Sequence, residues 1–100
     1  MIIDNKTFTI IYDGVYNDLS KCTICIDMNE ITKVMSIQLL YDRSVFKLNR
    51  YLQKNYKIHL RCYNNSVSFS GVATIENVSV NIDRTTNHSN IILYCTFESD

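Results

Sequence analysis

The sequence predicts an α+β fold that is mainly β, an antiparallel sheet, sandwich or barrel-like arrangement of about six to seven strands with one helix near residues 44–54. Several short segments alternate apolar and polar residues with the period of two that is typical of half-buried strands. Turns rich in asparagine separate these segments, in a chain with two glycines and no proline. The 100 residues, 46% of them hydrophobic and 20% charged, are expected to form a single domain, 1–100.

The first part of the chain predicts three strands. Residues 7–12 alternate and precede an Asp-Gly turn, and residues 21–27 alternate before a turn candidate at 28–30. Residues 33–41 fit a strand, with a helix as the alternative. The side chains expected to face inward from these segments are Phe8, Ile10, Tyr12, Cys22, Ile24, Ile26, Met35, Ile37, Leu39 and Tyr41.

The helix is expected over 44–54. Ser44 can accept hydrogen bonds as its N-cap, and Asn55 is suited to end it in a left-handed conformation. Its apolar stripe has the i, i+3, i+7 spacing of one helix face. The residues of that stripe are Val45, Leu48 and Leu52, with Tyr51 alongside.

The remaining residues predict strands over 56–63, 66–75 and 91–97, with a polar loop over 83–90. A tight hairpin turn is expected at Asn64 and Asn65. Gly71 is a candidate bulge within its strand. The inward positions change parity after residue 75, which predicts a bulge or turn near 76–77. The expected inward residues are Tyr56, Ile58, Leu60, Cys62, Val67, Phe69, Ala73, Ile75, Val78, Val80, Ile82, Ile91, Leu93, Cys95 and Phe97.

Charge is distributed unevenly along a chain whose net charge is zero. Residues 1–42 hold six acids and three bases, residues 43–75 hold six bases and no acid, and residues 76–100 hold four acids and one base. A basic surface is therefore predicted from the helix and the following strand, comprising Arg43, Lys47, Arg50, Lys54, Lys57, His59 and Arg61. It could be an ordinary solvated face, a docking surface for an acidic partner or a phosphate-binding surface. The zero net charge disfavours nucleic acid.

Catalytic and metal-binding patterns are weak. The four cysteines, Cys22, Cys25, Cys62 and Cys95, contain one C-x-x-C unit, whereas a structural zinc site usually pairs two such units. A strand would also point the two thiols of that unit to opposite faces. Zinc thus remains a minor alternative to buried, reduced cysteines, and a Cys62–Cys95 disulfide would require their strands to pair. No triad, acid/base pair or phosphate loop is evident, so neither catalysis nor a cofactor is expected.

The order of elements from residue 44 to residue 98 resembles the C-terminal half of tail-tube proteins of tailed bacteriophages. The similarity lies in a helix, then the strand YKIHLR (56–61), then VSFSGVATI (67–75) and a closing strand ending in YCTFE (94–98). It implies a self-assembling virion component. The closing segment 97–100 lacks the glycines usual in that family, and the chain is shorter than typical tube subunits.

The sequence therefore predicts a non-enzymatic structural protein of a bacteriophage, of the tail-tube, connector or capsid-associated kind. Its expected partners are further copies of itself or other virion proteins, not a membrane or a small-molecule substrate. The alternative is a small phage or bacterial inhibitor that places the basic surface on an acidic host protein or a nucleic acid. With no signal peptide or transmembrane segment evident, the expected location is the virion or the host cytoplasm.

Overall fold

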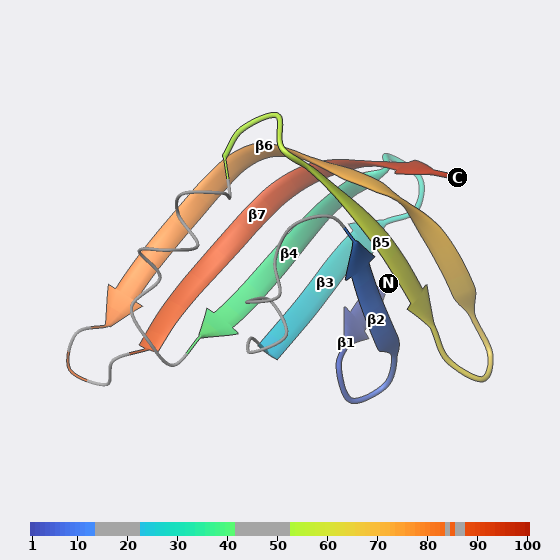
Figure 1. Cartoon of the computed structure of the whole chain (residues 1–100), viewed down its shortest axis with the longest axis horizontal. Coiled ribbons are helices and arrows are strands. Elements are labelled where there is room, and N and C mark those ends of the chain that lie inside the picture. The colour runs from blue at the N-terminus through green and yellow to red at the C-terminus, as the bar shows by residue number, and fades with distance from the viewer. Residues whose placement is uncertain (14–22, 42–52, 84, 86–87) are drawn as a thin grey trace.

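The structure, a computed structural model, describes residues 1–13, 23–41, 53–83, 85 and 88–100. These residues form one antiparallel sheet of seven strands in the order β1-β3-β4-β7-β6-β5-β2 (Figure 1). The strands are β1 (Ile2–Asp4), β2 (Thr9–Asp13), β3 (Thr23–Asn29), β4 (Val34–Tyr41), β5 (Lys57–Tyr63), β6 (Ser68–Asp83) and β7 (His88–Ser99). The prediction of a mainly β, antiparallel, barrel-like fold is confirmed.

The expected helix lies almost entirely outside the described residues, at 44–52. The described residues contain no helix, and the two last positions of the expected helix, Gln53 and Lys54, lead into a turn. Asn55 does adopt a left-handed conformation, with φ of 72°. Its backbone N–H donates to Ile75 O at 2.7 Å, which fixes the start of β5 against β6.

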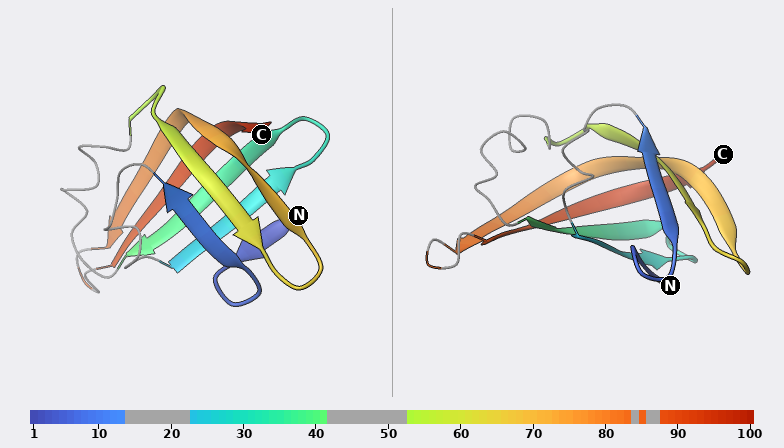
Figure 2. Two further views of the ribbon diagram at one scale, coloured as in Figure 1. Left: turned by 45° about the vertical axis from the view of Figure 1, so that its right-hand side comes forward. Right: turned by 60° about the horizontal axis from the view of Figure 1, so that its bottom comes forward.

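The sheet curls into a nearly closed barrel because its two edge strands are consecutive in the sequence. β1 and β2 lie at opposite ends of the strand order, yet only residues 5–8 join them. Asp4 holds this turn by accepting hydrogen bonds from the Thr7 hydroxyl (2.9 Å) and from the backbone N–H groups of Thr7 (3.0 Å) and Lys6 (2.9 Å). Figure 2 shows β2 and β5 crossing over the strands on the other side of the core.

The core fills the inside of this barrel and follows the alternation of the strands. In β5, Ile58, Leu60 and Cys62 are buried and the residues between them are exposed, as predicted. β4 alternates in the same way, so the segment predicted at 33–41 is a strand, which begins at Val34. The buried hydrophobic residues are Ile3, Ile24, Ile26, Met28, Met35, Ile37, Leu39, Ile58, Leu60, Cys62, Ala73, Ile75, Ile91, Leu93, Cys95 and Phe97.

β6 pairs with β5 along one edge and with β7 along the other, and the predicted change in which positions face inward occurs within it. Its register against β7 shifts between Ile75 and Asn77, so Glu76 is the extra residue of a bulge, as expected near 76–77. Val67 and Val80, which were expected to face inward, are instead 41% and 38% exposed. Gly71 is not a bulge, because it pairs in continuous register with Leu60 and with Ser99. Because Gly71 has no side chain, the backbone at the end of β7 can pass close to β6 at this position.

Three turns differ from, or add detail to, the sequence prediction. The turn expected at 28–30 begins later, because Met28 is a buried β3 residue and the turn occupies residues 30–33. The hairpin at Asn64 is confirmed, since its side chain accepts the N–H groups of Ser66 and Val67, both at 2.8 Å. The loop expected over 83–90 is shorter, because β6 runs to Asp83 and β7 starts at His88.

Candidate interaction site

The outer face of β5 carries the described part of the predicted basic surface. Lys57, His59 and Arg61 alternate with buried residues and are all exposed, as predicted. Lys54 is exposed in the turn before the strand. The other three predicted members, Arg43, Lys47 and Arg50, lie outside the described residues. The structure thus brings at least three basic side chains onto one strand face.

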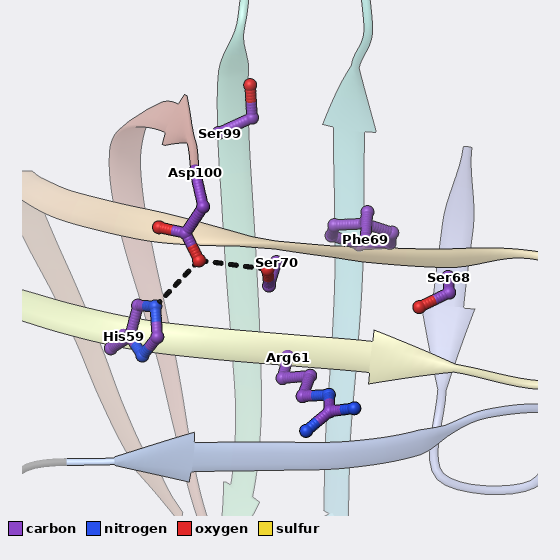
Figure 3. A pocket seen from close by; sticks show the side chains of 7 residues that line it. All are labelled: His59, Arg61, Ser68, Phe69, Ser70, Ser99 and Asp100. Atoms are coloured by element: carbon purple, nitrogen blue, oxygen red, sulfur yellow. Dashed lines mark hydrogen bonds and ion pairs between the residues drawn. The ribbon is translucent and has the colours of Figure 1, made fainter.

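An open pocket of about 580 Å³ lies beside two of these basic residues (Figure 3). The pairing of β5 with β6 places Ser70 opposite Arg61, and the end of β7 passes next to the same part of β6. The pocket is lined by His59, Arg61, Ser68, Phe69, Ser70, Ser99 and Asp100. Basic groups and hydroxyls therefore surround it, with one aromatic ring and one carboxylate.

Asp100 lies in this pocket and makes three hydrogen-bonding contacts there. Its Oδ2 lies 3.0 Å from His59 Nε2 and accepts the Ser70 hydroxyl at 2.9 Å, while its backbone N–H donates to Ser70 O at 3.1 Å. The hydrogen bond from His59, followed by the one from Ser70, holds the pKa of Asp100 below its usual value. The pocket therefore accommodates a carboxylate between an imidazole and a hydroxyl.

The side chain of Arg61 points away from Asp100. Its guanidinium carbon lies 5.8 Å from the centre of the Tyr63 ring, in the range of a cation–π contact. Figure 3 shows the guanidinium turned away from Asp100, toward β2. Within the described part of the chain, the structure shows no carboxylate in ion-pair distance of Arg61. Arg61 thus offers an exposed positive charge next to a pocket.

The pocket geometry differs from that of a nucleophilic serine. In a Ser-His-Asp triad the imidazole lies between the hydroxyl and the carboxylate, so that it can remove the hydroxyl proton. Here the Ser70 hydroxyl donates to Asp100, and the same carboxylate oxygen faces His59. The arrangement orders a carboxylate; it does not activate Ser70.

The described cysteines do not come together. Cys62 and Cys95 are buried, and burial raises the pKa of their thiols to about 11 and about 12. β6 lies between their strands, so the pairing that a disulfide would require is absent, and both thiols are free. Cys25 is partly buried on the outer face, and Cys22 lies outside the described residues. No group of three or more His, Cys, Asp or Glu side chains among the described residues is arranged to hold a metal ion.

The sequence identified the basic residues of this site but not its acidic member. Asp100 lies 41 positions from His59, and only the combined registers of β5, β6 and β7 bring the two together.

No helix in the described part of the chain has the length and apolar character needed to cross a membrane. Comparison with known proteins found no matching family model, no matching curated protein and no matching solved structure.

Proposed function

We propose that this protein is a non-enzymatic structural component of a bacteriophage virion that assembles with further copies of itself. The basic outer face of β5 contacts acidic surface on a neighbouring copy. The resemblance of residues 44–98 to tail-tube proteins supports the virion assignment. The barrel also supports the virion assignment, because its sheet holds the surface side chains rigidly in position for contacts with other molecules.

The observation that carries the proposal is an exposed basic strand, β5, whose Lys57 and Arg61 have no ion-pair partner among the described residues. The exposed acids Asp27 and Glu30 lie on β3 and in the turn that follows it, whereas Lys57 and Arg61 lie on β5. β4, β7 and β6 separate those two strands in the sheet. Among the described residues the one ion pair joins His59 and Asp100. Most of these charges are therefore left for contacts between molecules.

The magnitude of each such contact is small, which is why assembly needs several. An exposed ion pair contributes roughly 0.2–1 kcal/mol and is weakened by salt. Lys57 and Arg61 lie on one strand, and this pair of charges is repeated at each interface of an assembly. The sum of these contacts is favoured by low salt and weakened by high salt. Assembly of this kind is reversible and sensitive to ionic strength.

A pair of charge reversals tests the proposal. Replacing Lys57 and Arg61 together by Glu should lower the weight-average mass measured by light scattering at low salt, because the basic face becomes acidic. The matched control is Lys6→Glu, at an exposed residue in the turn between β1 and β2, compared with Arg61→Glu alone, which makes the same charge change. The proposal is wrong if the Lys57/Arg61 variant keeps the mass of the unmodified protein.

The location of the protein distinguishes a virion component from a binding protein that acts in the infected cell. Mass spectrometry of purified phage particles should find the chain at a stoichiometry that matches other structural proteins. Its presence in infected-cell lysate but absence from particles would instead favour the inhibitor alternative.

A further inference from the structure

The turn between β3 and β4 presents an isoleucine to solvent. Ile31 is 93% exposed, the highest value among the exposed large hydrophobic residues of the described chain. The side chain of Asn29 fixes the turn by accepting the N–H groups of Ile31 at 3.0 Å and Thr32 at 3.1 Å. Lys33 completes it with a φ of 59°, and its carbonyl accepts the N–H of Phe97 at 2.8 Å. The turn is thus firmly held, and Ile31 contributes nothing to the core.

Ile31 belongs to an apolar surface with acidic members. Met1 and Ile2 are 38% and 65% exposed, and Ile2 pairs with Asp27 across β1 and β3. The exposed Glu30 directly precedes Ile31. We name Met1, Ile2, Asp27, Glu30 and Ile31 the acidic knob after its two carboxylates, although the amino group of Met1 and the exposed Lys33 of the same turn carry positive charge. A cluster of exposed aliphatic side chains beside carboxylates is typical of a contact surface, in contrast to a single exposed residue.

The pocket beside β5 carries groups that complement the acidic knob, namely a positive charge and an aromatic ring. Arg61 supplies a positive charge that no described carboxylate neutralises, and Phe69 supplies an aromatic wall. Phe69 is itself held edge-on against Phe97, with ring centres 5.9 Å apart. Asp100 already occupies the position between His59 and Ser70. An incoming carboxylate would therefore meet Arg61, and an incoming aliphatic side chain would meet Phe69.

Glu30 and Arg61 are not paired within one molecule. β7 and β6 stand between β4, where the turn ends, and β5, which carries Arg61. Neighbouring strands are about 4.8 Å apart, so three strand spacings separate the two features along the sheet. Phe97 also anchors the turn to β7. The side chains of Glu30 and Arg61 are therefore available to pair with a second copy.

From this complementarity we infer that the acidic knob of one copy docks in the pocket of a second copy, with Glu30 paired to Arg61 and Ile31 packed on Phe69. The inference rests on the proposed self-association and identifies the two surfaces that make it. It gives the assembly a defined orientation, because the knob and the pocket are different parts of the chain.

A charge exchange between the two surfaces tests the inference. Glu30→Arg and Arg61→Glu, each alone, should weaken association about tenfold at low salt, because each places like charges in contact. The double variant should recover at least part of that loss, because the pair is restored with reversed sign. Ile31→Ser should weaken association as well. Sedimentation velocity over a concentration series measures all four, and thermal melting confirms that each variant folds.

Two matched controls complete the design. Glu76→Arg makes the same charge change at the exposed bulge of β6, and Val80→Ser removes an exposed apolar residue elsewhere on that strand. Neither should alter association. If Arg61→Glu dissociates the assembly but Glu30→Arg and Ile31→Ser do not, self-association stands and the docking inference is wrong. Failure of the charge exchange to restore association also overturns it, and an unmodified protein that stays monomeric overturns both proposals.

Discussion

Replacing Gly71 by Ala tests the close packing between β6 and the end of β7. A Cβ at this position would overlap the Glu98 carbonyl oxygen and would lie 2.5 Å from Phe97 Cζ and 2.8 Å from Ser99 Cα. Two of these three neighbours are backbone atoms of β7, which is hydrogen-bonded to β6 on the same side. The added methyl group therefore cannot be accommodated by a side-chain rotation alone.

The magnitude follows from two opposing effects. Inserting a methyl group into a packed site costs about 1–3 kcal/mol, and the backbone contacts place Gly71 toward the upper part of that range. Alanine also lowers the conformational entropy of the unfolded chain relative to glycine, which offsets this cost by about 0.4–1 kcal/mol. The net loss in the free energy of unfolding is thus about 2 kcal/mol, which for a chain of this size lowers Tm by roughly 8–16 °C.

Thermal unfolding followed by circular dichroism measures this loss. Ser79→Ala, on the exposed part of the same strand, is the control and should change stability by less than about 0.5 kcal/mol. Adding Phe97→Leu to Gly71→Ala should not restore stability, because it relieves one contact and leaves the two backbone contacts in place. A Gly71→Ala protein as stable as the parent would refute the close approach of β7.

Two further predictions concern titratable groups. Because burial raises the pKa of Cys62 and Cys95, iodoacetamide at neutral pH should label Cys25 well before either of them, as mass spectrometry of peptides would show; equal labelling rates in the folded protein would contradict their burial. Asp100 has a lowered pKa, so its contribution to stability is present above its usual pKa and is lost as pH falls through the lowered value. Carbon-13 NMR of its carboxyl group should give a midpoint below the ordinary one, and Ser70→Ala should raise that midpoint; an unmoved midpoint would show that the Ser70 contact is absent in solution.

The sequence was most informative where strict alternation coincides with burial on one face. β5 was predicted almost to the residue because every second side chain is apolar and buried. The same alternation identified the centre of β7, but that strand extends beyond the predicted 91–97 at both ends, to His88 and Ser99. The bulge at Glu76 was predicted for the same reason, since a change of parity within one strand has few other physical explanations. Periodicity alone could not decide 33–41, where packing against β3 and β7 determines the strand.

Other features depend on contacts that no local pattern encodes. β1 has three residues, too few to show a period, and it exists because Ile2–Asp4 pairs with β3. Gly71 looked like a bulge, but its role depends on the path of β7, which is distant in sequence. For the candidate site, alternation placed Lys57, His59 and Arg61 outward. The contribution of Asp100 needed the register of three strands.

The central claim is that contacts between the basic residues of β5 and acidic residues of a neighbouring copy drive assembly of identical copies. Light scattering of the unmodified protein at low and at high salt, at the same protein concentration, tests it most directly. The account predicts an oligomer at low salt whose mass falls as salt rises, because screening weakens exposed ion pairs. A protein that remains strictly monomeric at high concentration and low salt would contradict it.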